Sequence, residues 1–162
     1  IMVEQAIKAA GVQRRYGIIG TDISREAIFQ ARRGIYRESK MAMVDKSTNR
    51  DYFDPIGKGL WRVKADLRRR VCFLTSNILT DGSPLIRRKM HLIYCQNMLV
   101  YFRRWKRREI INQLRRHLDE QGCLLLGLGE LNNWVPGGFS RVTQRNIQAY
   151  IKDETVEQGV AR

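Results

Sequence analysis

Short apolar runs alternate with helical patterns along most of this chain. The runs predicted as buried strands are YGIIGTD (16–22), VCFLTSN (71–77), the start of MHLIYCQNMLVYF (90–102) and CLLLGLGE (123–130). The helical patterns cover residues 1–10, 25–33 behind a capping Ser24, and 105–118, with Gly122 just past the last one. Strands that alternate with helices predict an α/β fold with a mostly parallel sheet covered on both faces.

Two regions depart from this alternation. Between Gly34 and Arg70 turn residues are frequent, and GLWRVKADL alternates as a small hairpin would, so residues 37–70 are predicted to form an inserted β-subdomain within one domain, 1–162. FSRVTQ and NIQAYIK predict a terminal antiparallel pair of strands. DGSP (81–84) predicts a turn, and the last ten residues are predicted to be frayed.

Polar side chains follow four of the predicted strands, at the point where each strand ends. They are Asp22, Asn77, the pair Gln96 and Asn97, and Glu130. In open α/β sheets ligands bind outside the carboxyl ends of the strands, so these positions are expected to converge on one crevice.

Asp22 stands where doubly wound folds place a carboxylate that accepts hydrogen bonds from both ribose hydroxyls of a nucleotide. The alternative is that Asp22 caps the following helix. GLGE (127–130) lacks the third glycine of a dinucleotide-binding loop, and no helix pattern follows it. There is no Walker sequence, no HExxH and no recognisable Ser/His/Asp order, and His91 and His117 stand alone.

Charge narrows the choice of partner. Thirty Lys and Arg residues against sixteen Asp and Glu give a net charge of +14 over 162 residues, and 43% apolar residues with three prolines indicate a folded chain with a single core. Residues 61–120 hold fifteen of the cations, mainly in 62–70, 87–89 and 103–108. Such a face suits phosphates or an acidic protein, unless it is only a solvated helix surface. Because aromatic residues are not interleaved as stacking platforms, an acidic protein is the preferred partner over nucleic acid.

Three cysteines, Cys72, Cys95 and Cys123, form no CxxC pair, and each lies in an apolar run. They are predicted to be reduced thiols in the core, with neither a disulfide framework nor a metal site. No apolar run is long enough to span a bilayer, and the sequence shows no charged-then-apolar secretory leader, so the expected location is the cytoplasm.

Taken together and in order, YGIIGTDISREAIFQARRGIY, RRRVCFLTSNIL, HLIYCQNMLVYFRRWKRREIINQLRRHLDEQGCLLLGLGE and the final GF resemble the CheR-type chemoreceptor methyltransferases. The resemblance covers most of the chain, and YCQNMLVYFRRW is most similar to the PilK-like branch associated with type IV pilus motility. It implies a Rossmann-like methyltransferase sheet with antiparallel C-terminal strands. It also implies that S-adenosyl-L-methionine is the cofactor, S-adenosyl-L-homocysteine the product, and glutamate side chains on cytoplasmic helices of methyl-accepting chemoreceptors the acceptors.

By position, the resemblance implies that Asp22 binds the cofactor ribose and that Asn77 and Ile78 line the adenine site. Gln96 and Asn97 would face the methionine part, and Tyr101, the expected catalytic residue, would lie near the sulfonium and the acceptor carboxylate. The family commonly has Arg where this chain has Gln96. Without the charge and the paired N–H donors of a guanidinium group, recognition of a carboxylate is expected to be weaker or different.

The family's glycine-rich first motif, first strand and helical amino-terminal domain have no counterpart in these residues. The resemblance therefore predicts a fragment whose cofactor site is partly built. It also predicts unpaired strand edges, through which the chain could dimerise. The turn YFDPIGKGLW is shorter than the glycine-rich loop of members that dock a receptor tail, so no tail-dependent docking is expected.

A glutamate acceptor is already ionised near neutral pH, so no general base is required and the absence of a catalytic His or Ser is consistent with an enzyme. Two alternatives remain open. One is a fragment that binds a receptor or partner without turnover. The other is an RNA methyltransferase, which is disfavoured because SNIL and CQN lack the proline- and aromatic-containing cluster typical of base methylation.

Overall fold

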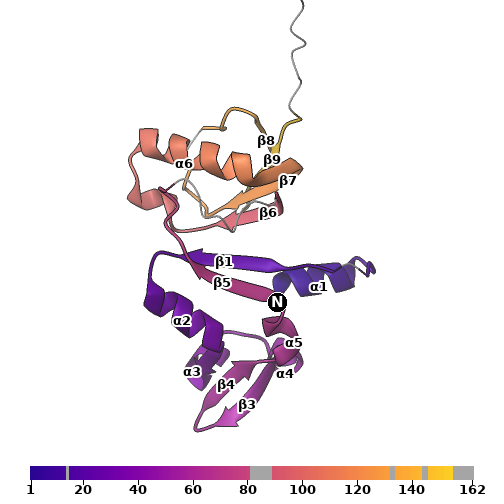
Figure 1. Ribbon diagram of the computed structural model, residues 1–162. Helices are drawn as coiled ribbons and strands as arrows, with labels where there is room; N and C mark the ends of the chain where they lie inside the picture. The colour runs from indigo at the N-terminus through magenta and orange to yellow at the C-terminus, as the bar shows by residue number, and fades with distance from the viewer. Residues whose placement is uncertain (14, 81–88, 132–133, 144–145, 155–162) are drawn as a thin grey trace, which may run out of the picture. The chain divides into compact units, whose positions relative to one another are not determined.

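The computed structural model describes residues 1–162 except 14, 81–88, 132–133, 144–145 and 155–162 (Figure 1). The chain divides into two compact units, Ile1–Asn77 and Ile78–Arg162. Each has its own cluster of buried side chains, whereas length alone predicted a single core. No helix in the described ranges combines the length and apolar character that crossing a membrane would need.

The first unit is organised around two parallel strands, β1 (Ile18–Asp22) and β5 (Val71–Thr75), paired from Ile18 opposite Val71 to Asp22 opposite Thr75. Helix α1 (Met2–Ala9) precedes β1, and α2 (Arg25–Arg33) follows it. The Oγ of Ser24 accepts the N–H of Ala27 at 3.2 Å, and Gly34 ends α2 in the left-handed conformation. The two predicted strands, the Ser24 N-cap and the bounds of α2 are confirmed, while α1 is one residue shorter at each end than the predicted 1–10.

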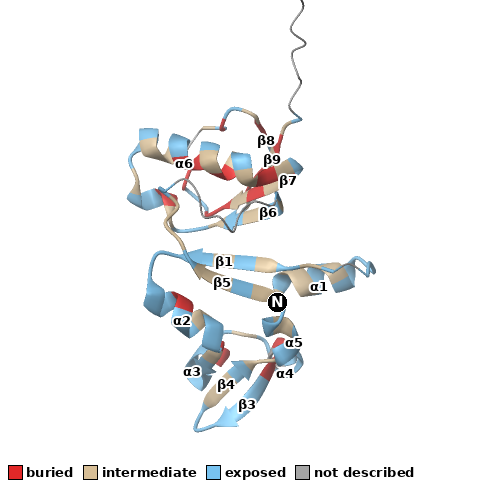
Figure 2. Cartoon of the chain, in the orientation of Figure 1, coloured by how far each residue is buried: buried red, intermediate tan, exposed pale blue. Residues whose placement is uncertain are grey.

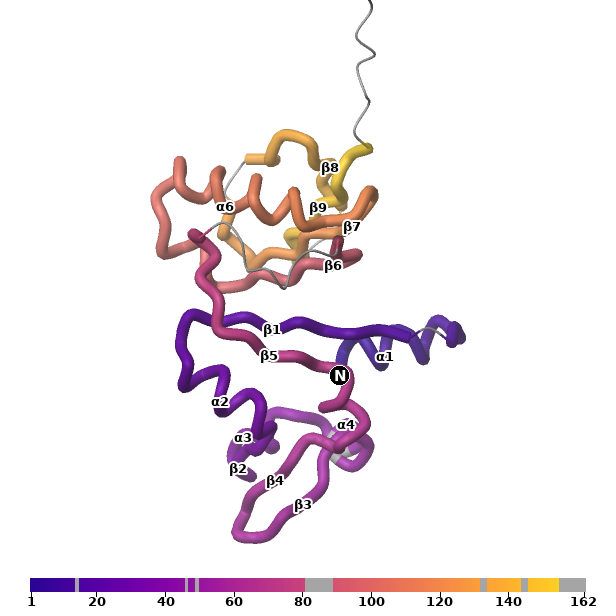
Figure 3. Tube along the Cα trace, viewed as in Figure 1, coloured from indigo at the N-terminus to yellow at the C-terminus, as the bar shows by residue number. Residues whose placement is uncertain are grey.

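A three-stranded antiparallel sheet in the order β2-β4-β3 lies between α2 and β5 in the sequence (Figure 3). Its elements are β2 (Ile35–Arg37), α3 (Glu38–Met41), α4 (Lys46–Tyr52), β3 (Phe53–Gly57), β4 (Leu60–Val63) and α5 (Ala65–Arg68). Met41, Tyr52 and Phe53 form its buried cluster. The predicted hairpin is confirmed as β3 and β4, while the subdomain limits of 37–70 stay a prediction.

The second unit holds a four-stranded mixed sheet in the order β6-β7-β9-β8. Its elements are β6 (Met90–Cys95), the 3-10 turn η1 (Leu99–Tyr101), α6 (Arg104–His117), β7 (Leu118–Leu126), β8 (Phe139–Arg141) and β9 (Gln148–Lys152). β6 and β7 are parallel, and β9 is antiparallel to both β7 and β8, which confirms the terminal antiparallel pair. Figure 2 shows the buried positions of this unit along α6, β7 and β9.

The boundary between α6 and β7 differs from the prediction. Leu118 was expected to end the helix, yet it is fully buried in extended backbone and starts β7. Gly122 therefore lies within the strand and is no helix cap. A Cβ there would come within 3.1 Å of the Met90 carbonyl oxygen, so glycine permits the close approach of β6. Trp105, at the start of α6, is 59% exposed.

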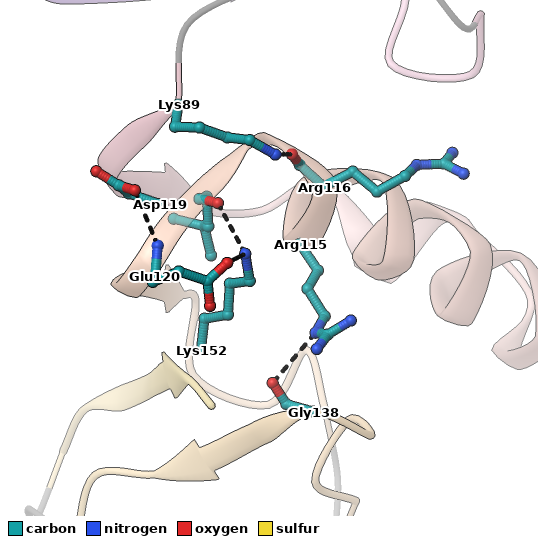
Figure 4. Close-up of polar contacts among 8 residues, drawn as sticks. Lys89, Arg115, Arg116, Asp119, Glu120, Gly138 and Lys152 are labelled. Atoms are coloured by element: carbon teal, nitrogen blue, oxygen red, sulfur yellow. Dashed lines mark hydrogen bonds and ion pairs between the residues drawn. The ribbon is translucent and has the colours of Figure 1, made fainter. Parts of the chain in front are cut away.

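Three polar contacts tie β9 and the start of β8 to α6 and β7 (Figure 4). The buried Lys152 Nζ donates to the carbonyl oxygen of Leu118 at 3.1 Å and pairs with the Glu120 carboxylate at 2.6 Å. The Nε of Arg115, on α6, donates to the carbonyl oxygen of Gly138 at 3.2 Å, just before β8.

The sequence also predicted unpaired strand edges and buried thiols. Within the described residues β1 pairs only with β5, and β6 only with β7, so each has one unpaired edge as predicted. Dimerisation through these edges stays a prediction. Cys72 is exposed and so is wrongly predicted as a core thiol, because its strand belongs to a sheet of only two strands that leaves this position uncovered; Cys95 and Cys123 are half-buried.

Candidate cofactor and acceptor site

Asp22 is the last residue of β1, and its side chain is exposed. Its Oδ1 accepts the backbone N–H of Ser24 at 2.8 Å, and Ser24 itself caps α2. The helix cap proposed as an alternative for Asp22 is therefore supplied by Ser24. Among the described residues, no donor is found for Asp22 Oδ2, which leaves an acceptor available at the strand end.

Asn77 lies at the same end of the two-stranded sheet as Asp22. Asp22 pairs with Thr75 across the sheet, and the N–H of Ser76 donates to the carbonyl oxygen of Asp22 at 2.9 Å. Asn77 follows directly and is half-buried. Ile78 begins the second unit, where its side chain packs against the core cluster.

Gln96 and Asn97 follow β6, and both side chains are exposed. The hydroxyl of Tyr94 donates to Gln96 Oε1, so the Gln96 amide is held along the strand. Asn97 has a φ of 57°, a left-handed conformation that only a minority of non-glycine residues adopt. The polar pair thus marks an abrupt turn of the backbone at the carboxyl end of β6.

Glu130 was expected to face the crevice, and this is wrong. Its side chain is 1% exposed and accepts backbone N–H groups from Met98, Leu99 and Gly127. A carboxylate is stable in the interior when it is satisfied in this way, so Glu130 belongs to the framework under the loops.

Tyr101 ends η1 and is 83% exposed. Val100, Trp105 and Leu128 are other exposed apolar side chains on or next to the loops that follow β6 and β7. Because β6 and β7 are parallel neighbours, both loops leave the same end of the sheet. Sequence reasoning missed Leu128, since an apolar residue inside CLLLGLGE gives no sign of exposure.

The structure thus places Asp22 and Asn77 at one end of the two-stranded sheet in the first unit, and Gln96, Asn97 and Tyr101 along the loop that follows β6 in the second. The convergence of both groups on one crevice stays a prediction.

A family model described as "CheR methyltransferase, SAM binding domain" matches residues 1–155. The chain belongs to this family. The cofactor that CheR domains of this kind bind is S-adenosyl-L-methionine.

Curated relatives agree with this assignment. The chain is 33% identical over 134 residues to chemotaxis protein methyltransferase 1 of Pseudomonas aeruginosa, covering 82% of this chain and 47% of the relative. It is 31% identical over 126 residues to chemotaxis protein methyltransferase Cher2 of Pseudomonas putida, covering 77% and 45%. Chemotaxis protein methyltransferase 1 of Vibrio cholerae is 31% identical over 142 residues, covering 87% and 51%. The chain therefore spans about half the length of the curated relatives it matches.

The residues described in this CheR domain fit part of the cofactor. The Asp22 carboxylate is exposed at a strand end with one oxygen unused by described residues, which suits the hydroxyl donors of a ribose. Asn77 beside it offers amide groups of the kind that pair with a base edge. The exposed Gln96 and Asn97 offer further amides in the second unit.

Proposed function

We propose that this chain methylates glutamate side chains on cytoplasmic helices of methyl-accepting chemoreceptors, with S-adenosyl-L-methionine as the methyl donor. The observation that carries the proposal is the CheR family match over residues 1–155. The similarity of YCQNMLVYFRRW to the PilK-like branch extends the proposal to receptors of type IV pilus motility as well as of chemotaxis.

In this proposal Asp22 binds the ribose hydroxyls, and Asn77 and Ile78 line the adenine. Gln96 and Asn97 contact the methionine part of the cofactor. These assignments agree with exposed polar groups at the ends of β1 and β6. The bound cofactor supplies an electrophilic methyl group, and the protein supplies alignment and exclusion of water.

Tyr101 is proposed to orient the acceptor. The glutamate carboxylate is ionised near neutral pH and needs no base, so the phenol is required only as a hydrogen-bond donor to one acceptor oxygen. Its 83% exposure leaves that hydroxyl accessible to a second protein. One carboxylate oxygen forms the new bond to the methyl carbon, and the bond from that carbon to sulfur breaks, giving a methyl ester and S-adenosyl-L-homocysteine.

The acceptor helix is proposed to be acidic. The chain carries a net charge of +14, and Arg103, Arg104 and Arg108 are exposed at the start of α6, close in sequence to Tyr101 and Trp105. Opposite charge speeds the encounter of two proteins and restricts their orientation. This chain has Gln96 where the family usually has Arg. The exposed arginines at the start of α6 are therefore the proposed source of cationic contacts with the acceptor helix.

The test is methyl transfer from labelled S-adenosyl-L-methionine to acidic receptor helices, with tRNA as a competing acceptor. The expected product is label on the receptor that alkali releases as methanol, as for a glutamyl methyl ester. Base-stable label in tRNA would contradict the proposal and favour the RNA methyltransferase alternative. Binding of both receptor and S-adenosyl-L-homocysteine without transfer would favour a module that binds without turnover.

A further inference from the structure

The loop at residues 96–102 carries Gln96, Asn97 and Tyr101, yet its conformation is not that of a regular element. Asn97 is left-handed, a short 3-10 turn follows at Leu99–Tyr101, and Phe102 is extended. A non-glycine residue in the left-handed region costs free energy and persists only where surrounding contacts fix it. The contacts that fix this loop come from two charged residues elsewhere in the sequence.

The first is Glu130, whose carboxylate lies under the first half of the loop. Its Oε1 accepts the N–H of Met98 at 2.8 Å and that of Leu99 at 2.9 Å. Its Oε2 accepts the N–H of Gly127 at 2.8 Å, at the end of β7. One buried anion therefore joins the loop after β6 to the loop after β7 through three charge-assisted hydrogen bonds.

The second is Arg107 on α6, whose guanidinium binds the other half of the loop. Its Nε donates to the carbonyl oxygen of Phe102 at 2.8 Å, and its Nη2 donates to that of Val100 at 3.4 Å. Its Nη1 donates to the backbone carbonyl oxygen of Glu130 at 2.9 Å. The anion thus takes the N–H groups that precede Tyr101, and the cation takes the carbonyl groups on both sides of it.

We propose that Glu130 and Arg107 are positioning residues, which hold the loop at 96–102 so that Gln96, Asn97 and Tyr101 stand at fixed places at the end of β6. This role rests on the proposed function, because the loop matters for chemistry only if those residues meet cofactor and acceptor. Neither residue touches the reacting atoms. Glu130 acts through the backbone of Met98 and Leu99, and Arg107 through that of Val100 and Phe102.

The variant Glu130→Gln tests the contribution of the buried carboxylate. The amide has nearly the volume of the carboxylate, but it has one acceptor oxygen instead of two, so its NH₂ faces at least one of the N–H groups. Amide hydrogen exchange at Met98 and Leu99 is expected to quicken about tenfold or more, while Leu124 and Tyr150 in the sheet keep their protection. The affinity for S-adenosyl-L-homocysteine is expected to fall about tenfold, since the backbone that follows Gln96 and Asn97 is no longer fixed at Met98 and Leu99.

The matched control is Glu109→Gln. Glu109 lies on α6 in the same unit, is half-exposed, and its carboxylate pairs with Lys106. The Glu109→Gln substitution removes the same charge as Glu130→Gln. It should change neither the exchange at Met98 and Leu99 nor the affinity for S-adenosyl-L-homocysteine.

The second variant is Arg107→Lys, which keeps the positive charge but loses the forked set of guanidinium donors. It should lower kcat more than product affinity, because it releases the carbonyl groups beside Tyr101. Should Glu130→Gln fail to fold, Arg107→Lys decides the question by exchange at Leu99 and Phe102.

Two results would overturn the proposal. One is unchanged exchange at the loop amides, or an equal acceleration throughout the sheet, which would mean that the two residues serve stability alone. The other is a loosened loop with product affinity and turnover equal to those of the unaltered chain. A failure of the proposed function is distinct, because the unaltered chain would then transfer no methyl group to receptor helices, while the exchange experiment would still report whether Glu130 holds the loop.

Discussion

Asp22 and Glu130 are two acids at the ends of strands, and they have opposite surroundings. Asp22 is exposed and has only the N–H of Ser24 as a neighbouring donor among the described residues, whereas Glu130 is buried under three N–H groups. The sequence predicted both at a crevice, because position at a strand end is readable from the apolar pattern. The donors that surround an acid come from distant segments, so the sequence could not separate an accessible carboxylate from a buried one.

Asp22→Asn should weaken binding of S-adenosyl-L-homocysteine by about tenfold, because hydrogen bonds to a charged acceptor contribute about 1.5–3 kcal/mol. Asn keeps an acceptor for the Ser24 N–H, so the fold should not change. Isothermal titration would measure the affinity, and Glu26→Gln, a nearby exposed acid on α2, is the control. Equal affinity in both variants would remove Asp22 from the ribose site.

Tyr101→Phe should lower turnover more than product affinity. The side chain is 83% exposed, so loss of the hydroxyl disturbs little packing, and the hydroxyl is assigned to the acceptor. Single-turnover methyl transfer and titration with S-adenosyl-L-homocysteine would separate the two quantities. Parallel losses in both would instead assign Tyr101 to cofactor binding.

Cys95 should resist alkylation near pH 8 while the exposed Cys72 reacts. Burial, and to a smaller extent the nearby charge of Glu130, raises the pKa of the Cys95 thiol to about 12. Its reactive thiolate is therefore scarce near pH 8. Relative to an unperturbed thiol, this lowers the thiolate fraction by about a thousandfold. Timed labelling with iodoacetamide and peptide mass spectrometry would check it; early labelling of Cys95 would contradict its burial.

Among the elements, α2 was predicted to the residue and α6 was not. Ser24 and Gly34 define α2 by local capping, which depends only on neighbouring residues. The local pattern predicted Leu118 as the last residue of α6. In the structure Leu118 is instead the first residue of β7, which pairs with β6. Pairing between distant strands overrides a local pattern, and it cannot be read from the local sequence.

Gly138→Ala should destabilise the second unit by about 1–3 kcal/mol. Gly138 has a φ of 75°, and a Cβ there would lie 2.5 Å from Arg115 Nε, so the substitution strains the backbone and displaces the contact between α6 and the start of β8. Urea unfolding would measure it. Gly137→Ala is the matched control, since a Cβ at Gly137 meets nothing within 4 Å and should alter stability by less than about 0.5 kcal/mol.

For the whole molecule, length predicted a single core, while the buried side chains form one cluster in each unit. Length sets how much apolar surface a chain can bury, but the division of that surface depends on which strands pair. The α/β class and the mixed second sheet could be predicted, because alternation of strand and helix patterns extends over the whole chain. The placement of Asp22 and Asn77 relative to Gln96 and Tyr101 stays a prediction.

The charge of +14 predicts salt-sensitive recognition of acidic receptor helices. Raising the ionic strength from about 0.1 M to about 1 M shortens the Debye length from about 10 Å to about 3 Å, and should slow association at least tenfold. Stopped-flow measurement with a labelled receptor fragment would check the rate. Binding of S-adenosyl-L-homocysteine should change much less, and a salt-independent receptor rate would contradict electrostatic attraction as the cause.

The strand order β6-β7-β9-β8 also bears on how the protein is made. β7 is complete at Leu126, but its antiparallel partner β9 starts at Gln148, beyond β8, so β7 has no neighbour on that side until the ribosome has added more than twenty further residues. The pairing of β1 with β5 needs nothing beyond Thr75. During translation the first unit can therefore form its sheet early, while β7 in the second unit has an unpaired apolar edge until β9 has been made, and a chaperone could protect this edge in the interval.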